Sequence, residues 1–269
     1  MRIERAAIAL VAASSLAACV EKSPTEPAAH ALVVHAVLDA SARDQYVVVQ
    51  STNGATASAT GVTGAVVTLS LPDGRNVRAA EERDSVHAIA SFDAPRLTTI
   101  YHFSLDQLGF TVVPGATYQL RVAVPDGRVV TGQTTVPSTT PVTTPESSQP
   151  FTLLRDTLRL SWSRVSGARS YEVSVVSVRG PTAIFADTSI ALTGQSSNMF
   201  GDDLFPFVGT PGQGTPYRVI VSAVDGNYYD YYRRSSDFFS GAGVIEHLDG
   251  ALGVFGSLVP IVSKQLAVK

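Results

Sequence analysis

The feature that most constrains this fold is a repeated two-residue alternation of apolar and polar side chains in short segments. In Tyr118–Val122, apolar residues alternate with Gln119 and Arg121, which is the period of a half-buried β-strand. Such segments are separated by Asp-Gly pairs, as in Pro72–Gly74 and Pro125–Gly127. Asp-Gly favours tight hairpin turns. The pattern therefore predicts an all-β chain.

Composition limits the classes of protein that this chain can belong to. The 269 residues carry a net charge of −3 without a basic stripe, so nucleic acid is not an expected partner. This length provides room for two domains of ordinary size. Cys19 is the only cysteine, so no disulfide can form within the chain and stability must come from core packing.

The N-terminus has the layout of a secretory signal peptide. Arg2 and Arg5 precede an apolar run from Ala6 to Ala18, and small residues come directly before Cys19. An ordinary signal peptide followed by a cysteine that has no special role is the alternative interpretation.

The segment Leu16–Cys19 resembles the lipobox of bacterial lipoproteins. The resemblance implies that Cys19 becomes the first mature residue and carries a diacylglycerol, usually with a further acyl chain on its amino group. Two acyl chains hold a protein firmly on a membrane. Val20 is not the Asp that retains some lipoproteins at the inner membrane, so we expect an outer-membrane location. The face of that membrane stays open.

Composition and a weak internal sequence repeat predict two similar domains. The segment Ser138–Pro150 is rich in Ser, Thr and Pro, as interdomain linkers are. Gly115–Gly127 and Gly214–Gly226 share a Tyr, an alternating strand and an Asp-Gly turn. We therefore predict five parts, namely a lipoprotein signal peptide (1–18), a tether (19–30), a first β-sandwich (31–137), a linker (138–150) and a second β-sandwich with a C-terminal tail (151–269).

The second half resembles a fibronectin type III domain. The resemblance lies in Leu158–Trp162, Val165–Ala168, Tyr171–Val173 and Tyr217–Val224, and the sequence departs from the family in the longer segment 193–214. It implies that Trp162 lies in the core. The predicted architecture is two immunoglobulin-like or fibronectin type III-like β-sandwiches in tandem.

The mature chain also resembles an uncharacterised family of Gram-negative outer-membrane lipoproteins. The resemblance rests on Cys19, the pair Val33-Val34, Pro114–Val122, Thr135–Pro137 and Gly250–Ser257 in this order. Members of that family are often associated with TonB-dependent import receptors of the outer membrane, which is a hint about a partner.

The sequence offers little that indicates catalysis or a cofactor. None of the five histidines has metal-ligand spacing with another His, Cys or Glu. No Gly-x-Ser-x-Gly nucleophile motif occurs, and Asp202-Asp203 is a weak calcium candidate that solvation explains better. We predict a protein that is not an enzyme and holds no metal or cofactor. A hydrolase or carbohydrate-active enzyme, and a purely structural envelope protein, are the alternatives.

The segment from Tyr228 to Arg234 is the candidate binding site. It holds four tyrosines and two arginines in seven residues, a composition typical of interface hot spots. An edge strand would place some rings inside and some outside, available to a protein or glycan. The alternative is that the rings fill the bottom of the second sandwich. The candidate residues are Tyr228, Tyr229, Tyr231, Tyr232, Arg233 and Arg234.

Overall fold

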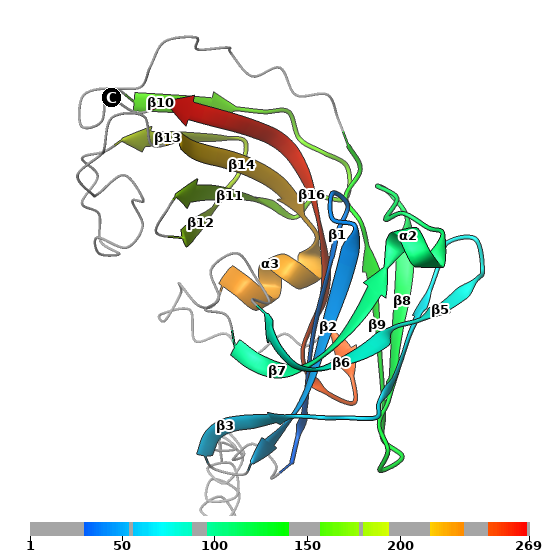
Figure 1. The fold of residues 1–269 in the computed structure, drawn as a ribbon. Helices are drawn as coiled ribbons and strands as arrows, with labels where there is room; N and C mark the ends of the chain where they lie inside the picture. The colour runs from blue at the N-terminus through cyan, green and yellow to red at the C-terminus, as the bar shows by residue number, and fades with distance from the viewer. Residues whose placement is uncertain are drawn as a thin grey trace, which may run out of the picture.

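The computed structural model describes residues 30–53, 56–87, 96–139, 157–177, 180–193, 216–233 and 247–267. Figure 1 shows one long curved β-sheet, two small sheets on its convex side and a short helix on its concave side. The predicted all-β fold of sandwich type is confirmed.

In the described part of the chain the large sheet has nine strands, which come from both halves of the sequence. In spatial order it contains β12 (Gly180–Ala186), β11 (Ser170–Ser177), β14 (Pro216–Val224), β16 (Leu252–Ala267), β1 (Leu32–Asp39), β2 (Asp44–Asn53), β7 (Arg96–Ser104) and β6 (Ala80–His87), with β3 (Thr56–Gly61) paired to β2. The strands β2 and β3 form an antiparallel hairpin.

Each small sheet covers one half of the large one. The first contains β15 (Leu248–Asp249), β9 (Val129–Thr135), β8 (Thr117–Ala123), β4 (Val66–Ser70) and β5 (Asn76–Arg78), and the second contains β10 (Thr157–Ser161) and β13 (Ser189–Thr193). The described residues also include the helices α2 (Leu105–Leu108) and α3 (Gly226–Tyr232). No helix among the described residues is long and apolar enough to cross a membrane.

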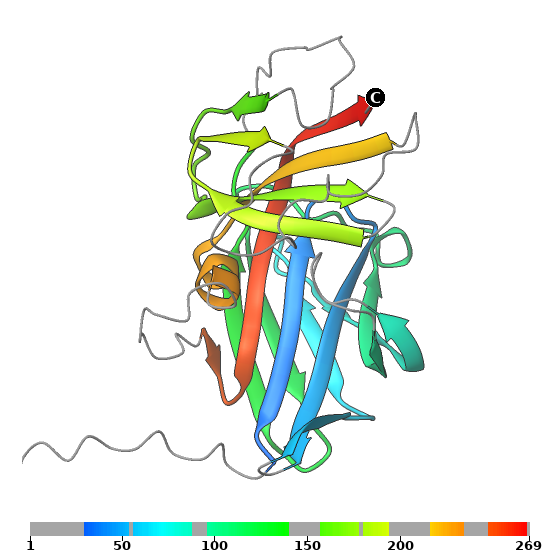
Figure 2. The same cartoon turned by 90° about the vertical axis from the view of Figure 1, so that its left-hand side faces the viewer.

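The strand β16 joins the two halves. Its first part pairs in parallel with β1, from Val33 opposite Leu252 to Asp39 opposite Leu258. Its second part pairs antiparallel with β14. Figure 2 shows this single strand (red) beside β1 (blue) and then beside β14 (ochre). The expected separation into units 31–137 and 151–269 differs from the structure here, because part of the tail completes the sheet of the first half.

The first core lies between β1, β2 and β7 on one side and β4, β8 and β9 on the other. Its fully buried residues include Val34, Leu69 and Leu120, and Phe255 of β16 packs among them. The hydroxyl of Tyr118 accepts a hydrogen bond from the backbone N–H of Val113 at 2.8 Å, so this ring ties the start of β8 to the preceding loop.

The second core lies between β10 and β13 on one side and β11 and β14 on the other. Trp162 is buried there, as the fibronectin type III resemblance predicted. The hydroxyl of Tyr171 accepts from the backbone N–H of Val165 at 2.6 Å. Tyr217, which the resemblance also includes, has a side chain outside the described part of the structure.

Candidate functional site

The Tyr-rich segment forms the helix α3, and the prediction of an edge strand was wrong. The helix lies on the concave side of the large sheet (Figure 1). Gly256 of β16 permits its close approach, because a Cβ atom at this position would lie 2.9 Å from the backbone nitrogen of Tyr228. A residue with a side chain at 256 would push the helix away from the sheet.

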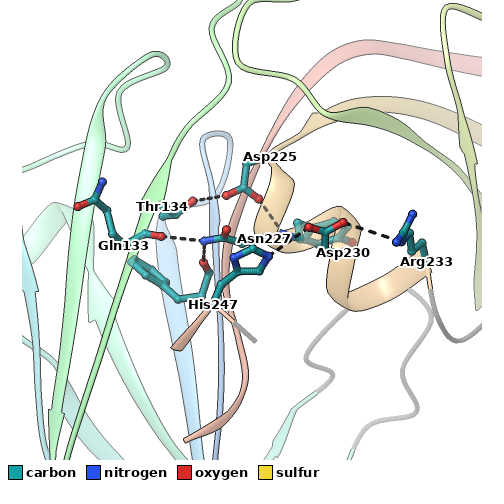
Figure 3. A network of polar contacts seen from close by, with 9 residues as sticks. Gln133, Thr134, Asp225, Asn227, Asp230, Arg233 and His247 are labelled. Carbon is teal, nitrogen blue, oxygen red and sulfur yellow. Dashed lines mark hydrogen bonds and ion pairs between the residues drawn. The ribbon is translucent and has the colours of Figure 1, made fainter. Parts of the chain in front are cut away.

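Asp225 starts the helix. Its carboxylate Oδ1 accepts from the backbone N–H of Tyr228 at 2.9 Å, which is an N-cap contact. The same oxygen accepts from the backbone N–H of Ser257 at 3.1 Å, and Oδ2 accepts from the hydroxyl of Thr134 at 2.5 Å. Figure 3 shows Thr134 pointing toward Asp225 between β9 and α3, and Asn227 pointing toward Gln133. One side chain therefore connects a small sheet, the shared strand and the helix.

The environment of Asp225 changes its acidity. The residue is 5 % exposed, and burial raises the pKa of its carboxyl above the ordinary value. The hydrogen bonds that it accepts act in the opposite direction and offset only part of the effect. Its hydrogen-bond partners Thr134, Tyr228 and Ser257 belong to three elements of the fold, so the contacts assign this carboxylate a structural role.

Asn227 forms hydrogen bonds to two strands, β9 and β16. Its amide Nδ2 donates to the carbonyl oxygen of Gln133 on β9 at 2.7 Å and to that of Phe255 on β16 at 2.8 Å. Asp225 and Asn227 thus continue the hydrogen bonding of β16 beyond the point where β14 ends.

Two of the predicted site tyrosines are core residues. Tyr228 and Tyr232 are 1 % and 4 % exposed, and they pack with Val224 and Val254. The hydroxyl of Tyr228 donates to the buried carboxylate of Glu172, which also accepts from the hydroxyl of Ser174. The two rings are interior, but they form a cluster of their own and do not fill the bottom of the second sandwich, as the alternative interpretation proposed.

The outer side of α3 carries a cluster that we call the Tyr229 face, defined as Arg169, Phe185, Tyr229 and Arg233. The Phe185 ring meets the Tyr229 ring edge-on, with centroids 5.2 Å apart. The guanidinium carbons of Arg169 and Arg233 lie 5.1 and 5.4 Å from the Tyr229 centroid, which is the range of cation–π attraction. Arg169 is exposed and the other three are half-buried.

Polar contacts flank the Tyr229 face. Asp230 lies between His247, at 3.2 Å, and Arg233, at 3.9 Å, as Figure 3 shows. The hydroxyl of Tyr231 shares a hydrogen bond of 2.7 Å with the Nε2 atom of His35 on β1. Tyr231 therefore helps to hold the helix against the first half.

The structure brings together only part of the predicted site. Tyr229 and Arg233 lie in the Tyr229 face, whereas Arg234 and the lipidation candidate Cys19 lie outside the described residues. Sequence reasoning missed Arg169 and Phe185, which are distant in the chain and meet α3 only through the pairing of β11 with β12 and β14. Among the described residues, no group of three or more His, Cys, Asp or Glu could hold a metal ion.

The fold and these contacts define an all-β sandwich protein with a helix-borne aromatic surface. Residues 20–252 match the family described as "Domain of unknown function (DUF4249)", and the chain belongs to this family. Among curated proteins, none matches the sequence significantly.

One similar solved structure is described as "Ca2+-stabilized adhesin helps an Antarctic bacterium reach out and bind ice". It shares 14 % identity with a TM-score of 0.21, and the match covers 90 % of this chain and 49 % of the adhesin chain. This chain thus spans about half the length of that adhesin chain.

Proposed function

We propose that this protein is a lipid-anchored binding or scaffolding protein of the cell envelope, and that its binding surface is the Tyr229 face. The observation that supports the proposal is the half-buried Tyr229 ring with two guanidinium groups within cation–π distance. The amide of Asn227 and the hydroxyls of Tyr228 and Tyr231, by contrast, make hydrogen bonds that hold α3 to the strands.

The composition of the Tyr229 face suits recognition. Tyrosine offers a large contact area at low entropic cost, and arginine offers several directed hydrogen-bond donors, so both are enriched at interface hot spots. The ring of Tyr229 is braced by Phe185, and the surface is therefore largely ordered before a partner arrives. Such preorganisation lowers the entropic cost of binding.

Support for the anchor comes from the sequence alone. Leu16–Cys19 fits a lipobox after a signal peptide, and we propose lipidation of Cys19 in the outer membrane. The lipoprotein resemblance suggests a TonB-dependent import receptor as the partner.

Lipidation is tested by replacing Cys19 with Ser. We expect the wild type to fractionate with membranes and to show acyl chains in its intact mass, because two chains anchor firmly. The Cys19→Ser variant should leave the membrane fraction. Equal membrane retention of both proteins, together with a wild-type mass without acyl chains, would contradict the proposal.

Binding is tested with the full-length, affinity-tagged protein solubilised from membranes in mild detergent. The double variant Tyr229→Ala/Arg233→Gln should lose the proteins that co-purify with wild type. The control double variant Val113→Ala/Arg159→Gln removes an exposed apolar group and an exposed charge elsewhere and should retain them.

Folding of both double variants is checked by circular dichroism. If the Tyr229 variant is folded and retains every wild-type partner, this surface is not the interface. If wild type co-purifies with partners but with no TonB-dependent receptor, the accessory role is contradicted while the binding role stands.

A further inference from the structure

We propose that the Tyr229 face binds an acidic segment of a partner protein, and that Arg169 holds a carboxylate of that segment. This inference rests on the proposed binding function and names the chemistry of the partner. Arg169 lies far from α3 in the sequence, yet its guanidinium lies against the Tyr229 ring.

The backbone places Arg169 firmly. Gly167 has a φ of +81° in the turn before β11, and the backbone N–H of Arg169 donates to the carbonyl oxygen of Val224 at 2.8 Å. Val224 is the last residue of β14, directly before the cap of α3. Arg169 is therefore fixed next to the start of the helix, and its side chain reaches the ring of Tyr229.

The guanidinium of Arg169 has its charge available. Within the described part of the chain, no carboxylate lies within ion-pair distance of it, and the guanidinium carbon lies 5.1 Å from the centroid of the Tyr229 ring. Two carboxylates of the same half have other partners: Asp187 pairs with Arg164 at 2.7 Å, and Glu172 accepts from two hydroxyls. An exposed guanidinium held in a defined position is prepared to receive a carboxylate in two parallel hydrogen bonds.

The surroundings favour a polypeptide over an anionic glycan. Phe185 adds an apolar ring next to the cationic groups, which suits an apolar residue that neighbours a carboxylate. Phe185 belongs to β12, the outermost strand at its end of the described large sheet. The backbone of an outermost strand can pair with an extended segment of another chain. The guanidinium groups favour a carboxylate, and the outermost strand β12 favours an extended polypeptide. An acidic segment of a partner protein meets both conditions.

The test uses full-length protein in detergent and a fluorescently labelled hexaglutamate peptide as the probe, with hexaglutamine as the neutral match. We expect hexaglutamate to bind by fluorescence anisotropy at low salt and hexaglutamine not to bind. Arg169→Gln should weaken the binding of hexaglutamate about tenfold or more, since a charge-assisted pair is lost. The control Arg159→Gln removes the same charge from an exposed position on β10 and should stay within about twofold of wild type.

Three results would overturn the proposal. Wild type could fail to bind hexaglutamate, Arg169→Gln could bind it as wild type does, or dextran sulfate could bind with dependence on Arg169 while hexaglutamate does not. The last result would assign the surface to an anionic glycan. None of these results touches the co-purification experiment with Tyr229→Ala/Arg233→Gln, so failure of the acidic-partner proposal is distinguishable from failure of the binding function.

Discussion

At the scale of single residues, Trp162 combines packing with a buried polar contact. It is 6 % exposed, its ring centroid lies 5.4 Å from that of Tyr171, and its Nε1 atom donates to the carbonyl oxygen of Asp187 at 3.0 Å. We expect Trp162→Ala to lower the free energy of unfolding by about 3–5 kcal/mol, as large-to-small core changes do. Chemical denaturation followed by circular dichroism measures this value.

Trp162→Phe is the matched control for this prediction. It keeps an aromatic ring and loses the indole donor, so its cost should be clearly smaller than that of Trp162→Ala. A loss below about 1 kcal/mol for Trp162→Ala would contradict the core position of this side chain.

Asp225 predicts a pH dependence whose sign follows from its burial. Because the folded-state pKa is raised while the unfolded chain titrates near about 4, the folded protein binds more protons between these two values. Stability contributed at this site is therefore lost as pH rises through the folded pKa, and it is fully present below the unfolded pKa. We expect wild type to gain stability relative to Asp225→Asn as the pH is lowered from 7 toward 4.

The measurement is urea denaturation of both proteins across that pH range. Comparison with Asp225→Asn cancels the titration of groups that do not interact with Asp225. A difference that stays constant with pH, or that changes in favour of the Asn variant on acidification, would contradict the raised pKa.

At the scale of elements, the close pairing of β1 and β16 depends on Gly253. Its φ is +115°, and a Cβ atom there would lie 2.1 Å from the carbonyl oxygen of Val34. We expect Gly253→Ala to lower the free energy of unfolding by at least about 2 kcal/mol, because a strained dihedral and a backbone clash add together. Thermal unfolding followed by circular dichroism provides the comparison with wild type.

Gly74→Ala separates the two causes. Gly74 also has a positive φ, +86°, but a Cβ atom there meets nothing within 4 Å. We expect Gly74→Ala to lower the free energy of unfolding by about 1 kcal/mol, which is the contribution of the positive φ alone. Equal losses for the two variants would mean that the close approach of β1 does not matter.

The elements that sequence predicted well are those with local signals. The strand β8 alternates as Tyr118–Val122 indicates. The helix α3 was missed because Asp225-Gly226 was interpreted as a hairpin turn. In the structure the Asp225 side chain caps a helix, and this choice depends on Ser257 and Thr134, which lie far away in the sequence.

At the scale of the whole molecule, the arrangement of strands and the site were only partly predictable. Two sandwiches follow from alternation and from the position of Trp162. The parallel pairing of β16 with β1 joins residues more than two hundred positions apart, and no local pattern specifies it. The same strand supports α3 through Gly256. The sequence indicated Tyr229 as a candidate, but Arg169 and Phe185, which complete its surface, come from other strands and were not predicted.

Sharing β16 predicts that the two halves unfold together. Leu69 is fully buried in the first core, whereas Trp162, the only tryptophan, lies in the second. If the halves are one cooperative unit, Leu69→Ala will lower the stability reported by Trp162 fluorescence by about 2–5 kcal/mol, although the substitution lies in the other half. The exposed change Val129→Ala in the first half should leave that value nearly unchanged.

One outcome would contradict joint unfolding of the halves. In that outcome the circular dichroism of Leu69→Ala reports destabilisation, while the unfolding midpoint from Trp162 fluorescence stays at its wild-type value. Independent domains would behave in that way, since a core defect in one is not felt by the other.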